Sequence, residues 1–443
     1  MEKTYNNKKN NGFFHMVQYL NRYLDDIIEK RLKMINAIVI IGPKWVGKTT
    51  TAKRHAKDII NLQDPDYIDS YKELAYFKPS KLLEGEKPLL IDEWQNIPKL
   101  WDAIRMRLDK IDNDEKYILT GSTIIDESKI MHSGTGRFNR IIMRPMSLYE
   151  SNESNGKISF LDLFKNPDMD IDGIKSELSI EDLIFAACRG GWPESLNKDN
   201  IEAQLFVVQN YIENISNIDV SGIDNVKRDP KRVEAILKAY SRNVCTLASD
   251  KTLLKDIKGK FPKMTHITYK EYLNALSRLF VIDEINSWSP NIRSASAIRQ
   301  KNKRAFIDPS IAVACLNLNP ENLLFDLKTF GFIFENLCIR DLKVYSYAEG
   351  GEVSYYRDKT GLESDCVIHL KNGDYALIEF RLGRNKIDEG ASNLIKLNNL
   401  IEKAIKEDKV KMRKPKFLAV ITGTELAYTR KDGVKVLPIG CLK

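Results

Sequence analysis

One segment, residues 42–49, constrains this chain more than any other part of its sequence. It reads Gly-Pro-Lys-Trp-Val-Gly-Lys-Thr and fits the pattern G-x-x-x-x-G-K-[ST] of a phosphate-binding loop. It follows a short apolar run, residues 37–41, and precedes a stretch with helical spacing, residues 48–60. In that setting the N–H groups of the loop can surround phosphate oxygens, and the helix N-terminus adds its dipole. The sequence therefore predicts a strand–loop–helix unit that binds nucleotide phosphates, with an ordinary glycine-containing turn as the alternative.

The loop suggests a role for two of its side chains in particular. Lys48 would neutralise the β- and γ-phosphates, and the Thr49 hydroxyl would bind Mg²⁺. The residues expected to contact the nucleotide are Gly42, Pro43, Lys44, Trp45, Val46, Gly47, Lys48, Thr49 and Thr50.

Two further buried-type strands end in polar residues. The strand at residues 89–91 is followed by Asp92 and Glu93, which we expect to hold the magnesium shell and to orient the attacking water, respectively. The next strand ends with Thr120 and Ser122, whose hydroxyls could sense the γ-phosphate or hold the water. Parallel strands bring their carboxyl ends to one crevice, so all four side chains are candidates for the same site. The alternatives are a solvated acidic pair at a helix start and a helix cap.

The composition is that of an ordinary globular protein with real cores. The 443 residues suggest about three domains, and 43% of them are hydrophobic while 29% are charged. The net charge of +8 permits anionic partners without demanding them. No apolar run approaches the roughly 18 residues that span a bilayer, so we expect no membrane passage. The cysteines are scattered and predict reduced thiols in a cytoplasmic protein: Cys188, Cys245, Cys315, Cys338, Cys366 and Cys441.

Several motifs in order resemble one family. GPKWVGKTT, LLIDEWQ, ILTGS and GRF, followed by RGGWPE, KRAFIDPS, GFIFENL, YYRDKTGLESD and IEFRLG, look like a poorly characterised group of bacterial and archaeal AAA-superfamily ATPases. The C-terminal half of these proteins is a domain of unknown function. The resemblance implies ATP and Mg²⁺ as cofactors and Lys48, Thr49, Asp92 and Glu93 in the roles given above.

The resemblance also implies roles for two arginines. Arg137, in the GRF motif, would be an arginine finger, and a finger supplied by a neighbouring subunit would imply a homo-oligomer. Without that resemblance, a lone arginine is more often a surface residue. Arg189 would be a second sensor beside the nucleotide, or else it would cap the carbonyls at the end of its helix.

The expected fold class is α/β with four parts. A P-loop AAA-type parallel sheet spans residues 1–150, a helical lid 151–230, a winged-helix-like module 231–315, and a restriction-endonuclease-like α/β domain 316–443. Ser179 and Asp182, and likewise Thr268 and Glu271, have the spacing of capping boxes that begin helices. The proposed recognition helix, residues 268–279, and the lysines before it could bind duplex DNA, although winged helices also serve as protein-packing modules.

The last part carries an acidic constellation. Glu335 on a helix, Asp365 on one strand and Glu379 on the next resemble the PD-(D/E)xK nuclease core, in which an acidic pair binds magnesium. Arg381 stands where such nucleases usually carry lysine, and it could instead pair with Glu363. The domain is therefore either an active nuclease or a nuclease-like binding domain without activity.

The turn between these two strands decides which side chains share a face. A three-residue turn at 371–373 would place Asp365 opposite Glu379, and Glu363 opposite Arg381. A two-residue Asn-Gly turn would place Asp365 opposite Phe380 instead.

Two functions fit these features. The first is a magnesium-dependent, ATP-hydrolysing switch or motor that acts on DNA and carries a nuclease-like domain. The second is a nucleotide-regulated scaffold whose C-terminal domain only recognises a partner.

Overall fold

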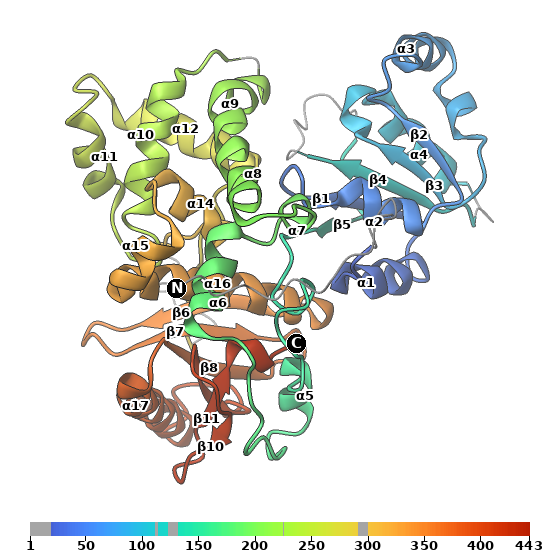
Figure 1. Ribbon diagram of the computed structural model, residues 1–443. Helices are drawn as coiled ribbons and strands as arrows, with labels where there is room; N and C mark the ends of the chain where they lie inside the picture. Colours follow the sequence, from blue (N-terminus) through green and yellow to red (C-terminus); the bar gives the residue numbers. More distant parts are fainter. Residues whose placement is uncertain (1–18, 111–113, 123–131, 225, 291–299) are drawn as a thin grey trace.

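Two β-sheets, far apart along the chain, organise the protein. The computed structural model describes residues 19–443 except 111–113, 123–131, 225 and 291–299. In Figure 1 the first sheet lies at the upper right, the second at the bottom, and a group of helices at the upper left joins them. Within the described residues, no helix combines the length and the apolar character that crossing a bilayer would require.

The N-terminal sheet is parallel and has the order β2-β3-β4-β1-β5. Its strands β1 and β4 are buried along their whole length because helices cover both faces, which suits their runs of Ile, Val and Leu. The strands are β1 (Ala37–Ile41), β2 (Asp58–Asn61), β3 (Leu89–Asp92), β4 (Tyr117–Gly121) and β5 (Phe138–Ile142). The helices are α1 (Tyr23–Leu32), α2 (Lys48–Arg54), α3 (Ile68–Phe77) and α4 (Lys99–Leu108).

The three strands that the apolar runs predicted are confirmed, but the helix predicted at residues 48–60 is too long. It ends at Arg54, and residues 58–61 form the edge strand β2. Only Ile60 of that strand is buried, so the strand shows no alternating pattern that could have revealed it.

The helical part begins at residue 180 and extends to residue 345. Ser179 caps its first helix, and Asp182 completes the predicted capping box. The capping box at Thr268 and Glu271 is wrong, because the helix starts earlier and Thr265 caps it by accepting from the Thr268 N–H. The helices are α6 (Ile180–Arg189), α7 (Pro193–Leu196), α8 (Ile201–Asn214), the π-helix η4 (Ile215–Asp219), α9 (Val220–Gly222), α10 (Pro230–Ser241), α11 (Asp250–Lys258), α12 (His266–Arg278), α14 (Pro309–Cys315), α15 (Pro320–Phe325) and α16 (Leu327–Tyr345).

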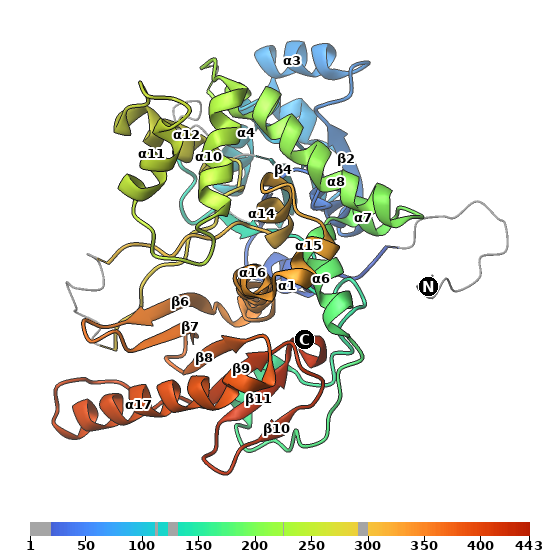
Figure 2. The ribbon, with the colours of Figure 1, turned by 60° about the vertical axis from the view of Figure 1, so that its left-hand side comes forward.

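The C-terminal sheet is mixed and has the order β10-β11-β9-β8-β7-β6. Figure 2 shows α16 on one side of it and α17 on the other. Cys366 pairs with Ile378 and His369 with Tyr375, which is the register expected for the three-residue turn, and Gly373 has the positive φ that this turn needs. The elements are β6 (Glu352–Arg357), β7 (Glu363–His369), β8 (Tyr375–Arg381), α17 (Ile387–Lys406), β9 (Leu418–Thr422), β10 (Tyr428–Thr429) and β11 (Lys435–Pro438).

The segment from residue 151 to 178 does not belong to a lid. It runs along the C-terminal sheet, where Ile158 forms a parallel bridge with Leu442 and Lys175 an antiparallel bridge with Leu426. The short helix α5 (Phe160–Lys165) packs its aromatic rings on Phe417, and both figures place it beside that sheet. The lid expected over residues 151–230 is thus corrected: its first part is a component of the C-terminal domain, because its hydrogen-bonding partners lie at the end of the chain.

Candidate functional site

The loop between β1 and α2 has the geometry of a phosphate-binding loop. Gly42 has φ +152°, and a Cβ there would lie 2.2 Å from the Met143 carbonyl oxygen, so only glycine fits. Gly47 adopts the left-handed conformation directly before α2, and Val46 between them is buried. The loop therefore presents its backbone at the carboxyl edge of the sheet, where the helix dipole adds positive potential.

Lys48 lies folded over its own loop. Its Nζ donates to the carbonyl oxygens of Gly42, at 3.1 Å, and of Pro43, at 2.8 Å. Burial lowers the pKa of Lys48 to about 8, although Glu93 and Asp92 oppose that shift. The ammonium group is thus buried and held by neutral acceptors, and a phosphate would be a stronger partner for it.

Asp92 gathers two hydroxyl groups. Thr49 Oγ1 donates to Asp92 Oδ1 at 2.7 Å, and Thr120 donates to the same oxygen. A hydroxyl and a carboxylate from adjacent elements are the oxygen ligands that Mg²⁺ takes beside nucleotide phosphates. These residues therefore fit a Mg²⁺ ion that accompanies a nucleotide.

Glu93 is held from three sides. It has φ +52°, its N–H donates to Thr120 Oγ1 at 3.0 Å, and its carboxylate accepts from the Ser122 hydroxyl and the Gln95 side-chain amide. Thr120 and Ser122 therefore contact the acidic pair, as their positions after β4 predicted. Sequence reasoning missed Gln95, although it stands two residues after Glu93 within the LLIDEWQ motif.

A cavity of about 1060 Å³ lies over the loop. The sheet edge, the segment before α1, and helices α7 and α8 all contribute to its walls. Besides the loop residues Lys44, Trp45 and Gly47–Thr51, its lining includes Tyr19, Arg22, Glu93, Ser122, Pro193, Asn197, Lys198, Phe206 and Asn210. The helical residues were not predicted, since no local pattern links them to a site 150 residues earlier.

Arg22 bonds to the phosphate loop and was not predicted from the sequence. Its Nη1 donates to the Val46 carbonyl at 2.9 Å, while its Nε lies 3.0 Å from Glu150. Both side chains of this ion pair are almost fully buried. Arg22 therefore ties the phosphate loop to the chain that follows β5.

Arg137 does not reach the loop of its own chain. It directly precedes β5, whose first residue, Phe138, is aligned with Ala37 at the start of β1, whereas the loop follows the end of that strand. The start and the end of β1 are four residues apart, which corresponds to about 13 Å along a parallel strand. The guanidinium is half-exposed and bonded to Asp109 at 2.7 Å. An interaction of Arg137 with the phosphates bound in its own chain is therefore excluded.

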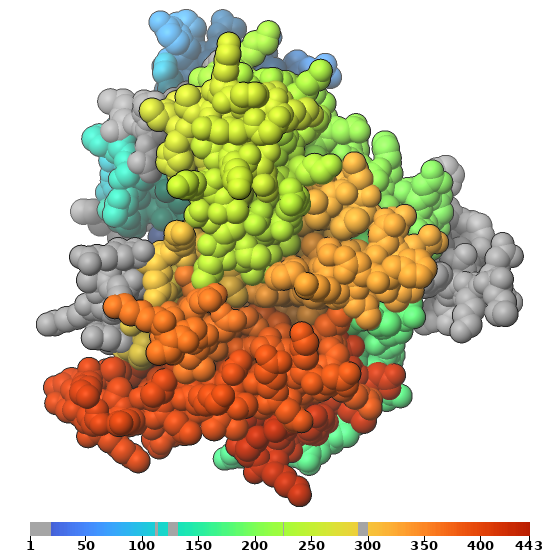
Figure 3. All heavy atoms as spheres, turned by 90° about the vertical axis from the view of Figure 1, so that its left-hand side faces the viewer, coloured from blue at the N-terminus to red at the C-terminus, as the bar shows by residue number. Residues whose placement is uncertain are grey.

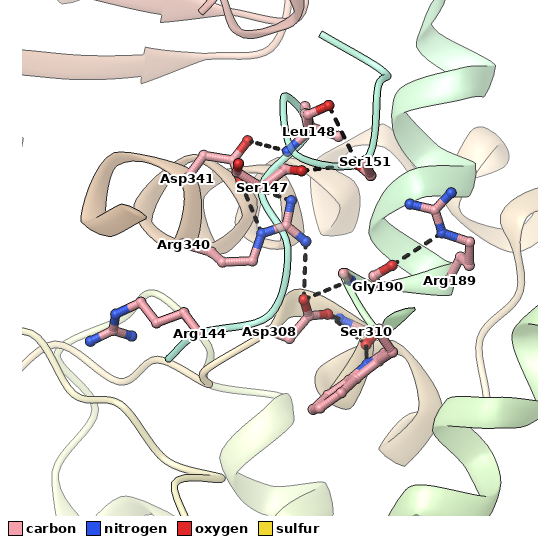
Figure 4. A network of polar contacts seen from close by, with 12 residues as sticks. Arg144, Ser147, Leu148, Ser151, Arg189, Gly190, Asp308, Ser310, Arg340 and Asp341 are labelled. Carbon is pink, nitrogen blue, oxygen red and sulfur yellow. Dashed lines mark hydrogen bonds and ion pairs between the residues drawn. The ribbon is translucent and has the colours of Figure 1, made fainter. Parts of the chain in front are cut away.

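Arg189 does not line the nucleotide cavity. It is buried, and its Nε donates to the Gly190 carbonyl at 3.1 Å (Figure 4). Its Nη2 lies 2.9 Å from Glu153. The expectation of a second sensor is thus corrected, because Glu153 from the segment after β5 takes its charge.

A buried network holds the turn before α7 in place (Figure 4). The Gly191 N–H and Arg340 Nη1 both bond to Asp308 Oδ2 at 3.0 Å. Asp341, next to Arg340 on α16, accepts from the Leu148 N–H at 3.1 Å. The wall that α7 gives to the cavity is therefore positioned by α16, a helix of the C-terminal half.

The C-terminal carboxylates come together, but two cations lie among them. Lys303 Nζ is 2.7 Å from Glu335 and 3.7 Å from Asp365. Arg381 lies 3.0 Å from Asp365 and is also paired with the fully buried Glu379. Among the described residues, no group of three or more His, Cys, Asp or Glu side chains could hold a metal ion. The metal site predicted at Glu335, Asp365 and Glu379 is therefore corrected, because lysine and arginine neutralise it.

The protonation of this cluster follows from burial. Burial, and then the charge of Asp365, raise the pKa of Glu379 well above its usual value, although Arg381 opposes the shift. Burial raises the pKa of Asp365, but Lys303 and Arg381 outweigh it and the pKa falls below its usual value. The predicted pairing of Arg381 with Glu363 is wrong, since Glu363 contacts Arg357 at 3.4 Å.

Comparisons with known proteins found family matches for three segments of the chain. Residues 35–152 match the model of an AAA domain family, and residues 180–322 and 330–442 match two domains of unknown function, DUF8612 and DUF4143. No curated protein matches the chain.

Solved structures with similar folds are distant. A Walker-type ATPase of Pyrococcus abyssi is 13% identical, with a TM-score of 0.43 over 67% of this chain and 96% of its own. A RuvB variant from Thermotoga maritima is 14% identical, with a TM-score of 0.25 over 58% of this chain and 88% of its own. A STAND protein with a tetratricopeptide repeat sensor from Pyrococcus horikoshii is 14% identical, with a TM-score of 0.21 over 71% and 47%. Scores this low support no transfer of function.

The family match and the loop geometry agree on the N-terminal part and leave the rest unassigned. Residues 35–152 match an AAA domain family and contain a loop with phosphate-binding geometry, and two segments that match domains of unknown function follow.

Proposed function

We propose that this chain is a magnesium-dependent ATPase whose hydrolytic site is the cavity over the phosphate loop. The observation that carries the proposal is the convergence of Lys48, Thr49, Asp92 and Glu93 at one edge of the sheet. Mg²⁺ would be held by Thr49 and Asp92, and it would neutralise charge on the β- and γ-phosphates.

Lys48 and Glu93 have different roles in the proposed reaction. Lys48 exchanges its two carbonyl partners for phosphate oxygens and stabilises the charge that develops on them. Glu93 orients the attacking water and accepts its proton, while Ser122 and Gln95 fix the direction of its carboxylate.

Two substitutions test this assignment. Lys48→Ala should lose nucleotide affinity, whereas Glu93→Gln should bind ATP normally and stop turnover. Glu86→Gln, which alters an exposed glutamate near the same sheet, is the matched control. Normal turnover in Glu93→Gln would show that another group orients the water.

We further propose that Arg137 serves the site of a neighbouring copy in a homo-oligomer. This rests on its exposure and on its position at the sheet edge opposite its own loop. Arg137→Ala and Glu93→Gln chains, each inactive alone, should regain ATPase activity when mixed, because a mixed interface can hold one intact site. No recovery in the mixture would argue against an arginine supplied in trans.

The region 230–306 supports a proposal of duplex DNA binding. Its order of elements, α10, α11, α12 and then two antiparallel bridges, Ile282 with Phe306 and Ile285 with Lys303, supports the proposal of a winged-helix-like module. The lysines on α11 and just after it are exposed: Lys251, Lys255, Lys258, Lys260 and Lys263. The segment that carries them belongs to the yellow-green upper part of the molecule in Figure 3. Gel shifts on duplex DNA with and without ATP test this, and an absence of binding in every nucleotide state would leave the scaffold function.

For the C-terminal domain we propose a nuclease-like fold that recognises a partner without cleaving. The supporting observation is that Lys303 and Arg381 neutralise the carboxylates. Supercoiled DNA should stay intact with Mg²⁺ or Mn²⁺, and metal-dependent nicking that disappears in Asp365→Ala would overturn the proposal. All six cysteines are free, in agreement with the proposed cytoplasmic location.

A further inference from the structure

The phosphate loop is bonded directly to the helical part of the chain. Lys44 Nζ lies 2.6 Å from Asp219 Oδ1, across 175 residues of sequence. The next residue of the loop, Trp45, packs on Tyr211 with 5.6 Å between the ring centroids. Tyr211 packs in turn on Trp192, with 4.5 Å between the centroids. A charged contact and an aromatic one therefore connect the loop with α8 and the turn that follows it.

The Lys44–Asp219 pair is open to competition by phosphates. Lys44 is 44% exposed and lines the same cavity as Lys48 and Thr49, whereas Asp219 is only 10% exposed. A nucleoside triphosphate brings several negative charges into that cavity, and the ammonium group sits on a flexible stem. A polyphosphate can therefore attract Lys44 more strongly than a single carboxylate can.

Asp219 lies in a π-helical turn. It is the last residue of the π-helix η4, between α8 and the three-residue α9. Single π-turns within helices are rare and occur frequently at functional sites. Nearby, the buried hydroxyl of Tyr211 has no hydrogen-bond partner among the described residues, so the packing beneath Trp45 leaves one polar group unsatisfied.

We propose that Asp219 is a positioning residue for the nucleotide and acts through Lys44. Without nucleotide it holds Lys44 away from the phosphate positions. When the β- and γ-phosphates enter, Lys44 moves to them and the end of α8 is released from the loop. The inference rests on the proposed binding of ATP and adds a route from the phosphates to the helical part.

Linkage fixes the sign of the effect. Binding of a triphosphate must break the Lys44–Asp219 pair, so the strength of that pair is subtracted from the affinity. A neutral residue at 219 removes this cost for ligands that reach Lys44. AMP has no β- or γ-phosphate and leaves the Lys44–Asp219 pair intact, so its affinity does not change when residue 219 is neutral.

The test is titration of the full chain with ATP, ADP and AMP by calorimetry, together with tryptophan fluorescence. Trp45 is 40% exposed and the other four tryptophans are buried, so the fluorescence reports mainly on the loop. Asp219→Asn should bind ATP three- to tenfold more tightly and AMP with unchanged affinity. Asp224→Asn breaks an ion pair with Arg228 in the same segment and should change neither.

The outcomes separate this inference from the proposed function. Absence of ATP binding in the wild-type chain would refute the ATPase itself. Wild-type ATP binding with an unaltered ATP affinity in Asp219→Asn, or an equal change for AMP, would overturn the role of Asp219 and leave the ATPase standing. Should Asp219→Asn fail to fold, Lys44→Gln carries the test. Weaker binding of ATP with intact AMP binding supports the inference, and unchanged ATP affinity overturns it.

Discussion

Lys303 provides the strongest test of how the C-terminal carboxylates are neutralised. Its ammonium group lies 2.7 Å from Glu335 and 3.7 Å from Asp365, and its side chain is 9% exposed. At an effective dielectric constant of about 20, the Coulomb attractions at these distances are about 6 and about 4.5 kcal/mol. Desolvation offsets most of this gain, but removal of the lysine alone leaves the buried Glu335 without its counter-ion, while Asp365 keeps Arg381. We expect Lys303→Met to lower the free energy of unfolding by about 3–5 kcal/mol at neutral to alkaline pH.

The pH dependence of this loss has a definite sign. Burial raises the pKa of Glu335 from 4.5 to about 7 even beside Lys303. A carboxyl group whose pKa is higher in the folded state destabilises the fold as the pH rises from the unfolded to the folded pKa. Without the lysine the folded pKa of Glu335 rises further. The part of the Lys303→Met deficit that comes from Glu335 should therefore be small near pH 5, open above about pH 7 and be largest at alkaline pH.

The assay is thermal unfolding of both chains across that pH range. Lys301→Met, which alters an exposed lysine two residues earlier, is the matched control and should unfold like wild type. Adding Glu335→Gln to Lys303→Met should restore much of the stability at pH 8, because the carboxylate that lost its counter-ion is gone. Equal stability of Lys303→Met and Lys301→Met at pH 8 would refute the neutralisation argument.

Three further predictions concern the ATPase site. Because burial lowers the pKa of Lys48 to about 8, and phosphates favour its charged form, ATP affinity should fall as the pH rises through 8; calorimetry in buffers of different ionisation enthalpy should show proton uptake on binding near that pH. Gly42→Ala places a Cβ 2.2 Å from the Met143 carbonyl oxygen and should abolish nucleotide binding, while a folded variant with normal affinity would contradict the loop geometry. Ser122→Ala removes a hydrogen bond to the charged Glu93 and should lower kcat about tenfold with KM unchanged in steady-state assays, whereas a change in KM alone would mean that the hydroxyl contacts the nucleotide.

The main features of the proposed ATPase site could be predicted from the sequence. The phosphate loop and the ends of β3 and β4 were found because each function there belongs to a short segment. The glycines of the loop permit the backbone conformation that surrounds a phosphate. The apolar run that ends in Asp92 predicts both a strand and the carboxylate at its end. For β7 and β8 the sequence left two registers open, and the structure has the one that belongs to a three-residue turn at residues 371–373.

The arginines and the lid were harder to predict. Arg137 and Arg189 carry the right charge for the roles expected of them, but their distances from the loop depend on which sheet edge a strand starts from and on which acid lies nearby. Residues 151–178 have no sequence pattern that distinguishes a lid over the nucleotide site from a segment that packs along the C-terminal sheet. Their hydrogen bonds go to residues some 270 positions later in the chain.

The sequence by itself determined that this chain has the motif of a phosphate-binding loop between a strand and a helix, because that motif resides in consecutive backbone N–H groups and a few adjacent side chains. Only the tertiary structure decided where the charges find their partners. It brought Lys303 to the carboxylates of α16 and β7, and Lys44 to Asp219. Those contacts join segments that local periodicity cannot relate, since an ion pair depends on distance and burial and leaves no signal in the spacing of residues.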